Sequence, residues 1–378
     1  MRILFPVIGF HEQTAELANA LSVRHEVGLI VLDGLYELTE KSKEYFNTLH
    51  SLAPHAKISV KNKWRKRDPR TIETIFQVLK WIKSWKPDLI HVQEAYDYRL
   101  FMILSFVRNI PLVLTVHDPE IHFGEEFKYQ TPEKRFELAL SRKIRRMADQ
   151  VIVHGQAMKE ALIHTKHVVP LKIEVIPLIA LSSLEKLVQS TIYEEPGSIL
   201  FFGRIWPYKG LEYLIAAEPL IAKRIENFRI VIAGAGENLE KYYKMMVNKD
   251  RFIVYNQYLS RVEVAKLFKK ASIVAFPYKE STQSSVLTTA FVFGKPVVAT
   301  KVGTFPEYIV DGETGLLVPP HDVDKFAEAI IALLKDKHLR RKMGKSAHRI
   351  AENELSPSTI ARQSEQVYNR VIKTFKKK

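Results

Sequence analysis

Two basic side chains, Arg204 and Lys209, follow the apolar segment ILFFG and stand on either side of Trp206-Pro207. Arginine presents a planar fork of N–H donors and lysine presents a compact charge, so together they suit adjacent phosphate groups. Such a pair can also stabilise a diphosphate as it leaves. The alternative reading is two surface bases beside a turn.

Hydroxyl and amide side chains follow another apolar segment, IVAFPY, and precede the helical pattern VLTTAFVFG. They are Ser281, Thr282, Gln283, Ser284 and Ser285. The first N–H groups of a helix bind anions because they carry partial positive charge. We therefore expect a second phosphate-binding element here, although the same residue types also serve as ordinary helix caps.

Three further positions follow apolar segments. Gly234 and Gly236 in the sequence GAG would let the backbone approach a ligand, a weak signal without the full dinucleotide fingerprint. His117 closes LVLTV, where a histidine can orient a sugar hydroxyl or polarise a reacting centre. Gly9 ends the first apolar segment and is less specific. His91 lies inside DLIHVQ and is interpreted as a packing residue.

The elements that must position these residues alternate between short apolar strands and amphipathic helices. The predicted strands are Ile3–Val7, Glu26–Leu32, Leu89–Gln93, Leu112–Val116, Gln150–His154, Ile173–Ile176, Ile199–Phe202, Arg229–Ala233, Arg251–Val254, Ile273–Phe276, Pro296–Ala299 and Gly315–Val318. A helix is predicted from the recurrence of Ile72, Ile75, Phe76, Leu79 and Ile82, ending at Lys86-Pro87. This alternation predicts an α/β protein of two doubly wound, Rossmann-like domains with a ligand cleft between them.

The alternation of strands and helices is interrupted once, between Leu178 and Ser198, where Ser182-Ser183 and Pro196-Gly197 occur. We therefore predict an N-terminal domain over residues 1–180, a linker over 181–198 and a C-terminal domain over 199–356. The last helix, from about Pro357 to Lys378, is long and basic.

Composition excludes several classes of site. The 378 residues are 46% hydrophobic and 26% charged, as in globular proteins, and include no cysteine. Disulfides, thiolate zinc sites and cysteine nucleophiles are excluded, and a reducing, cytoplasmic setting is the simplest expectation. No apolar run reaches the roughly 20 residues that span a bilayer.

The formal charge of +15 is concentrated in two clusters, Lys57–Arg70 with Trp64 among its bases and the tail Arg362–Lys378. Basic residues with an embedded tryptophan suit an anionic membrane surface. The alternative is a solvated basic surface. A specific nucleic-acid partner is not expected, because no recognised binding module occurs.

Together these motifs resemble the retaining glycosyltransferases of the GT-B fold known as glycosyltransferase family 4. GRIWPYKG is similar to the family's diphosphate motif, GKPVVATKVGTFPEYIVDGETGLLVPP to its C-terminal signature, and LTVHD to its N-domain element. The resemblance implies that His117 contacts the transferred sugar, that Arg204 and Lys209 bind the diphosphate, and that Gly9 lies in a phosphate-facing loop. It also implies a donor-binding C-terminal domain, an acceptor-binding N-terminal domain joined by the last helix, and no metal or other cofactor.

The chain departs from the family at the paired glutamates, whose positions fall on Ser281 and Thr289. Glu280 lies one residue earlier, and we expect it to contact the sugar in their place. Thr289 is expected to reach a ribose hydroxyl. Ser284 stands where the family has glycine and still offers its backbone amide. The N-domain loop also has Gly9 alone where the family has paired glycines.

The sequence thus predicts transfer of a sugar, with retention, from a nucleoside diphosphate sugar to a hydroxyl acceptor, lipid-linked or glycan. Without an in-register carboxylate, the departing phosphate is expected to accept the acceptor's proton on the same face. The alternatives are a catalytically weak paralogue or partner subunit that only binds nucleotide sugar, and, within the same fold, a nucleotide-sugar epimerase.

Overall fold

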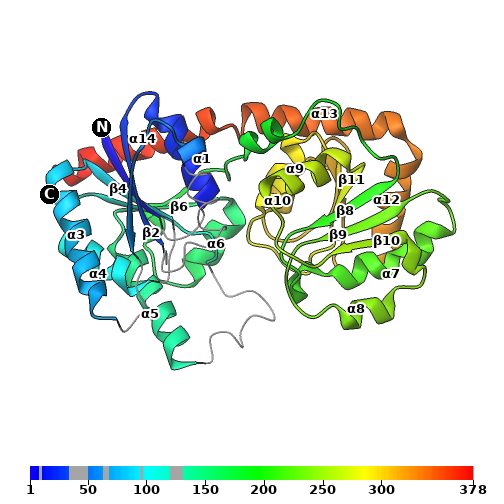
Figure 1. Ribbon diagram of the computed structural model, residues 1–378, viewed down its shortest axis with the longest axis horizontal. Coiled ribbons are helices and arrows are strands. Elements are labelled where there is room, and N and C mark those ends of the chain that lie inside the picture. Colours follow the sequence, from blue (N-terminus) through cyan, green and yellow to red (C-terminus); the bar gives the residue numbers. More distant parts are fainter. Residues whose placement is uncertain (8–10, 34–49, 63–67, 94–96, 120–130, 378) are drawn as a thin grey trace. The chain divides into compact units, whose positions relative to one another are not determined.

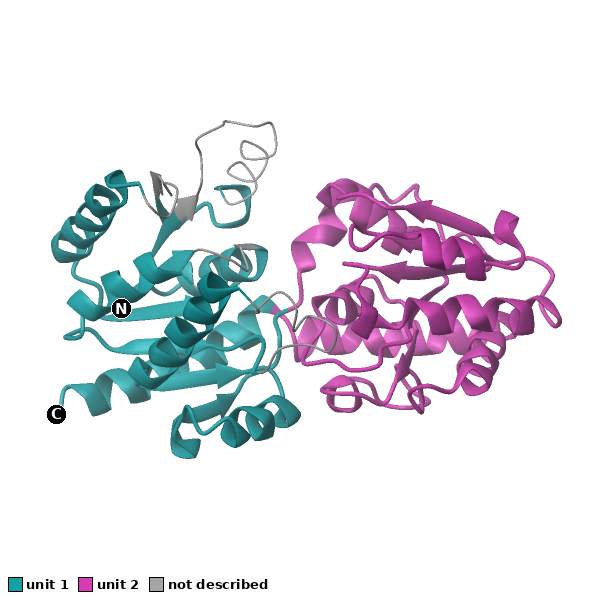
Figure 2. Cartoon of the chain, turned by 90° about the horizontal axis from the view of Figure 1, so that it is seen from below, with its two compact units in different colours: residues 1–120, 127–179, 357–378 teal, residues 121–126, 180–356 magenta. Residues whose placement is uncertain are grey.

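The computed structural model of the chain describes residues 1–7, 11–33, 50–62, 68–93, 97–119 and 131–377. These residues form two compact α/β units, each with a parallel sheet flanked by helices (Figure 1). Unit 1 contains the described residues up to Ile179 together with the C-terminal segment from Pro357, and unit 2 contains Ala180–Ser356 (Figure 2).

In unit 1 the described strands form a seven-stranded parallel sheet in the order β3-β2-β1-β4-β5-β6-β7. The strands are β1 (Arg2–Val7), β2 (Glu26–Asp33), β3 (Lys57–Asn62), β4 (Leu89–Gln93), β5 (Leu112–Thr115), β6 (Gln150–Val153) and β7 (Ile173–Val175). The strand order reverses between β1 and β4. Ligands of doubly wound sheets bind beyond the carboxyl ends of the strands at such a point.

Helices cover both faces of this sheet because successive strand side chains point to opposite sides. Leu4 lies in one core cluster, whereas Ile3 and Phe5 lie in the other. The first face is covered by α3 (Arg70–Trp85), α4 (Tyr98–Phe106), α5 (Pro132–Met147) and α6 (Gln156–His164). The second is covered by α1 (His11–Ser22) and α14 (Pro357–Phe375).

Unit 1 confirms the six strands predicted for it, with ends that differ by one residue at most. Strand β3 is not predicted from the sequence, because the basic residues from Lys57 onward indicate a charged surface cluster. The predicted helix is also present as α3, but its apolar side chains do not all face the core. Ile72 and Phe76 are exposed, whereas Ile75, Val78 and Ile82 are buried.

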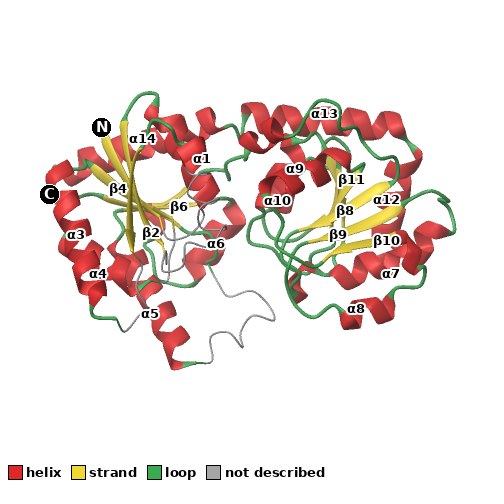
Figure 3. Ribbon diagram, in the orientation of Figure 1, coloured by secondary structure: helices red, strands yellow, loops and turns green. Residues whose placement is uncertain are grey.

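Unit 2 has a six-stranded parallel sheet in the order β10-β9-β8-β11-β12-β13. Figure 3 draws its strands in yellow and the surrounding helices in red. Its strands are β8 (Ser198–Phe202), β9 (Arg229–Ala233), β10 (Phe252–Tyr255), β11 (Ile273–Phe276), β12 (Val297–Thr300) and β13 (Gly315–Val318). Its helices are α7 (Leu211–Ala222), α8 (Glu240–Met245), α9 (Arg261–Lys270), α10 (Ser285–Val292), α11 (Phe305–Tyr308), α12 (Val323–Lys335) and α13 (Lys337–Asn353). All six predicted strands are confirmed. The order reverses between β8 and β11, which places the loops after these two strands at the expected ligand position.

The segment predicted as a linker, residues 181–198, lies within unit 2. It begins with a short 3₁₀ helix, Ser182–Leu187, and the side chains of Leu181 and Leu184 are buried in the unit 2 core. Burial of these two leucines gives the segment a fixed place on the unit, which its serine, proline and glycine content did not suggest.

Candidate functional site

Close backbone packing shapes the loop that follows β8. Gly203 has a φ of +113°, and Gly234, at the end of β9, has a φ of +141°. A Cβ atom on Gly234 would lie 2.1 Å from the Gly203 carbonyl oxygen, and one on Gly236 would lie 2.1 Å from that of Ile205. Glycine is required at these positions because no side chain fits between the two loops. Gly234 and Gly236 therefore support the loop that carries Arg204.

Lys209 ends a short 3₁₀ helix, Pro207–Lys209, and its side chain is buried. Its Nζ donates a hydrogen bond of 2.6 Å to the Tyr278 hydroxyl and lies 4.5 Å from the centre of that ring. Among the described residues, no carboxylate forms an ion pair with it. Burial, and secondarily the charge of Arg204, lowers the pKa of Lys209 to about 7.

Arg204 is exposed, in contrast to Lys209. Its positive charge also lowers the pKa of Tyr278, whereas burial, the larger effect, raises that pKa. One buried cation and one accessible cation thus share the loop end. A buried cation is costly unless it is paired, so this arrangement favours the binding of an anion.

The loop between β11 and α10 supplies polar groups beside these cations. The Ser281 Oγ and Gln283 Oε1 atoms are buried, and neither has a hydrogen-bond partner within the described part of the chain. Ser284 is the N-cap residue of α10, but its side chain forms no capping hydrogen bond. Its hydroxyl instead interacts with Tyr278 and slightly lowers the pKa of that phenol. Buried polar atoms are rarely left unsatisfied, so the oxygens of Ser281 and Gln283 point to a polar ligand.

A second loop presses against this one. A Cβ atom on Gly303, whose φ is +51°, would lie 1.6 Å from the Ser281 carbonyl oxygen. Gly203 in turn lies between the Lys209 Nζ and the Val286 side chain of α10, since a Cβ on Gly203 would meet them at 3.3 and 3.4 Å. Lys209 and the start of α10 are therefore neighbours, and the structure brings the predicted donor residues of unit 2 together.

Two further predicted residues differ in their surroundings. Thr289 is buried on the second turn of α10 and donates a 2.8 Å hydrogen bond to the carbonyl of Ser285, the first helical residue. Its hydroxyl proton is thus used within the helix, and only its acceptor capacity is available to a ligand. Glu280 is half-buried in the loop before α10.

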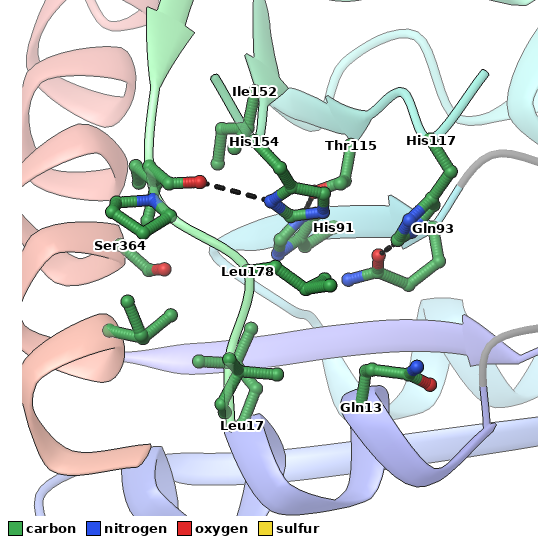
Figure 4. Close-up of a pocket in the computed structure, with 14 residues that line it drawn as sticks. Gln13, Leu17, His91, Gln93, Thr115, His117, Ile152, His154, Leu178 and Ser364 are labelled. Atoms are coloured by element: carbon green, nitrogen blue, oxygen red, sulfur yellow. Dashed lines mark hydrogen bonds between the residues drawn. The ribbon is translucent and has the colours of Figure 1, made fainter. Parts of the chain in front are cut away.

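Unit 1 has a small pocket at the carboxyl ends of β4, β5 and β6, lined by both polar and apolar side chains (Figure 4). His117 is buried there, with its Nε2 2.7 Å from the Gln93 Oε1. Because an amide oxygen only accepts, Nε2 carries the proton and Nδ1 carries the lone pair. Burial holds the pKa of His117 well below its ordinary value, so the ring is neutral.

Two more histidines line the same pocket. The His154 Nδ1 lies 3.0 Å from the Ile176 carbonyl oxygen, and its ring centre lies 4.9 Å from that of His117. His91 lies between Tyr368 and Thr115, at 2.6 and 2.8 Å. Both nitrogens of His91 are thus satisfied, which confirms its interpretation as a packing residue. The cavity volume of about 20 Å³ leaves room for about one water.

Three contributors to these sites were not predicted. Tyr278 and Gln93 lie at or just beyond the ends of predicted strands, and a polar residue at a strand end is a signal that could have identified them. Arg145 of α5 is buried and donates hydrogen bonds of 2.8 and 2.9 Å to the carbonyls of Asp118 and Pro119, directly after His117. No local sequence signal marks a contact across 26 or 27 residues.

Gly9, the predicted residue of the N-domain loop, lies outside the described residues. No group of three or more histidine, aspartate or glutamate side chains within the described ranges is arranged to hold a metal ion. Nor do the helices in those ranges include one that is long and apolar enough to cross a membrane.

Two family models together match most of the chain. The model described as "Glycosyltransferase Family 4" matches residues 9–178, and the model described as "Glycosyl transferases group 1" matches residues 183–350. The division between the two matches falls close to the start of unit 2 at Ala180.

Individual proteins show the same likeness. The D-inositol 3-phosphate glycosyltransferase of Corynebacterium efficiens is 27% identical over 285 residues, which cover 70% of this chain and 67% of that protein. An uncharacterised glycosyltransferase of Methanocaldococcus jannaschii is 27% identical over 298 residues, or 75% of each chain. The crystal structure of Anabaena HepE in complex with UDP has a TM-score of 0.71 at 21% identity, covering 98% of this chain and all of HepE.

Proposed function

Because this chain belongs to the family 4, group 1 glycosyltransferases and has their GT-B fold, we propose that it transfers a sugar from a nucleoside diphosphate sugar to a hydroxyl acceptor with retention. The observation that carries this proposal is the buried Lys209, which has no described carboxylate partner and neighbours the start of α10. A diphosphate supplies the missing negative charge.

Each donor residue predicted in unit 2 has a role in this proposal. Lys209 and Arg204 bind the diphosphate, and the N–H groups at Ser284 and Ser285 bind a phosphate oxygen at the start of α10. Ser281 and Gln283 direct buried oxygens toward the bound donor. Glu280 contacts the sugar, and Thr289 accepts a hydrogen bond from a ribose hydroxyl. Unit 2 is thus the donor unit, supported by the glycines at 203, 234 and 236.

Unit 1 is proposed as the acceptor unit, with His117 toward the transferred sugar. The Nδ1 lone pair of a neutral histidine accepts a hydrogen bond from a sugar hydroxyl without adding charge. Gln93 fixes that tautomer through its contact with Nε2. A neutral contact suits a transition state in which the sugar itself becomes positively charged.

The proposed step takes place on one face of the sugar. The bond between the anomeric carbon and the diphosphate oxygen breaks, and the acceptor oxygen bonds to that carbon from the same side. The acceptor's proton passes to the departing diphosphate oxygen, so the products are a glycoside and a nucleoside diphosphate. Lys209 and Arg204 stabilise the charge that develops on the leaving group. The configuration of the product's anomeric centre, read by proton NMR, tests retention.

No metal or other cofactor enters this scheme, because Lys209 and Arg204 provide the positive charge that a metal ion otherwise provides. Turnover should therefore survive complete chelation of divalent ions by EDTA. Loss of turnover on chelation, restored by added metal, would contradict this part of the proposal.

We further propose a cytoplasmic enzyme that binds the inner, anionic face of a membrane, where a lipid-linked acceptor would be found. Four exposed apolar side chains on neighbouring helices support this: Ile72, Phe76, Phe106 and Phe136 of α3, α4 and α5. The basic tail Arg362–Lys378 ends the same unit. Sedimentation with vesicles containing anionic lipid, but not with neutral vesicles, is expected. A soluble glycan acceptor is the alternative.

A nucleotide-sugar-binding paralogue or partner subunit remains the second candidate, since Ser281 and Thr289 replace the paired glutamates of the family. Both candidates require donor binding, and only the enzyme transfers or hydrolyses the donor. Release of UDP from UDP-sugars, measured with and without added acceptor sugars, separates them.

Donor binding is tested by thermal unfolding of the full chain with a panel of nucleotides and nucleotide sugars. A ligand that binds only the folded state raises the midpoint, by mass action. UDP and UDP-glucose are the first probes, since HepE has been crystallised with each. We expect at least one nucleoside diphosphate to raise the midpoint and nucleosides to leave it unchanged. No response to any diphosphate would refute the proposal.

A further inference from the structure

Tyr278 lies immediately beyond β11, and its side chain is buried almost completely. The aromatic rings of Tyr208, Phe276 and Phe305 surround it, with centroid distances of 6.2, 5.6 and 5.2 Å. Its backbone is also fixed, because the Thr300 hydroxyl donates a 2.6 Å hydrogen bond to the Tyr278 carbonyl. The phenolic oxygen therefore has one well-defined position.

That oxygen is the acceptor for Lys209. The 2.6 Å contact is the only hydrogen bond that Lys209 Nζ makes to a described side chain. Rings of Tyr278 and Tyr208 lie 4.5 and 5.7 Å from Nζ, and Gly203 closes another side. An ammonium has three donors, so two remain for a ligand when the phenol takes one.

The Tyr278 hydroxyl, which accepts the hydrogen bond from Lys209, is a neutral group. Burial keeps the pKa of Tyr278 above its ordinary value, so the phenol stays protonated near neutral pH. A carboxylate in this place would neutralise Lys209 and compete with an incoming anion. A phenol fixes the direction of the amine and leaves the positive charge available.

We propose that Tyr278 is a positioning residue, which holds the Lys209 amine in place for the diphosphate of the donor without neutralising it. This inference rests on the proposed function, since it specifies how the diphosphate site is built. Tyr278 itself touches no reacting atom in this account and acts through Lys209.

The test is a double-mutant cycle on the full chain, with inorganic pyrophosphate as the probe and binding followed by ³¹P NMR. Tyr278→Phe keeps the ring and removes the acceptor, and should weaken pyrophosphate binding about 10-fold. In the Lys209→Met background the same substitution should have no further effect, because its partner is absent. Tyr193→Phe, at an exposed tyrosine of the same unit, is the matched control and should bind as the wild type does.

A second readout distinguishes positioning from a general loss of structure. Without its acceptor, Lys209 is protonated less readily, so the pH above which Tyr278→Phe loses affinity should shift downward. If Tyr278→Phe does not fold, 3,5-difluorotyrosine at position 278 replaces it. Fluorine weakens the oxygen as an acceptor and keeps the side-chain shape, so weaker pyrophosphate binding is again expected.

The outcomes are separable. Equal pyrophosphate affinity in wild type and Tyr278→Phe, or an equal loss in the presence and absence of Lys209, overturns the role of Tyr278 and leaves the proposed function intact. Failure of the wild-type chain to bind either pyrophosphate or UDP overturns the proposed function, and this inference with it.

Discussion

Both units have polar groups near the carboxyl ends of their parallel strands. The two sets of groups differ in charge and in hydrogen bonding, and therefore in the ligands that they favour. In unit 1, His117 and His91 are hydrogen-bonded and neutral. In unit 2, Lys209 has no described counter-ion, and Ser281 and Gln283 have buried oxygens without described partners. Neutral imidazoles suit a neutral sugar, whereas a buried amine without a counter-ion favours an anion.

The difference shows that burial alone does not specify a ligand. Burial is the main cause of the lowered pKa in both His117 and Lys209. For histidine the result is a neutral ring at any pH near neutrality. For lysine, whose pKa falls to about 7, the result is a group that becomes fully charged once a phosphate approaches.

Removal of the buried cation should have the largest effect. Lys209→Ala is expected to lower kcat of sugar transfer about 1,000-fold, because charge on the departing diphosphate loses its buried partner. Lys223→Ala, at an exposed lysine of the same unit, is the control and should retain activity. Steady-state kinetics with a nucleotide sugar measure kcat of both variants. Unimpaired turnover in Lys209→Ala would contradict the assignment of Lys209 to the diphosphate.

Removal of the neutral histidine should lower the same rate constant, but by a smaller factor. His117→Ala is expected to lower kcat about 100-fold, through loss of a contact to the sugar in the transition state. His164→Ala, at a histidine on the surface helix α6, should leave kcat unchanged. If both substitutions had the same effect on kcat, His117 would have no specific role.

A steric change tests whether the loop at 281–285 belongs to the anion site. Gly303→Ala should weaken UDP binding about 10-fold, because its Cβ would displace the Ser281 carbonyl. Gly312→Ala is the matched control: its φ of +78° brings similar backbone strain, but no atom lies within 4 Å of the new Cβ. Calorimetry of UDP binding compares the two. Equal UDP affinities of the two variants would show that the loop at 281–285 does not contribute to UDP binding.

The pH dependence of UDP binding should reflect Lys209. Free Lys209, with a pKa of about 7, is largely charged at about pH 6 and largely neutral at about pH 8.5. UDP affinity should therefore fall severalfold as pH rises between these values, since binding must then take up a proton. Lys209→Arg stays charged and should show a flatter profile. A wild-type affinity that rises with pH would contradict this assignment.

The smallest effect concerns stability. The folded chain holds Lys209 at a pKa of about 7, and the unfolded chain at about 10.4, so stability is lost as pH falls from about 10 to 7 and stays lost below. Lys209→Met should thus stabilise the unliganded protein by about 1–3 kcal/mol near pH 7. Urea unfolding at pH 7 and pH 10 measures the gain, which should shrink at the higher pH.

Most strands and the main basic residues of the site can be predicted from the sequence. The features that cannot be predicted depend on contacts formed only in the folded chain. Twelve predicted strands are present because short apolar runs between helical patterns are a strong local signal. The strand at 57–62 was hidden by its basic residues. The contact between Lys209 and Tyr278 joins residues 69 positions apart, so only the adjacency of β8 and β11 reveals it. The burial that sets both pKa values is likewise a property of the packed fold.

UDP titration of three proteins by calorimetry tests the central claim most directly, namely that unit 2 binds the donor diphosphate through Lys209. We predict that His117→Ala binds UDP with the affinity of the wild type, whereas Lys209→Met binds it at least about 100-fold more weakly. Undiminished binding by Lys209→Met, with a loss in His117→Ala, would contradict the account.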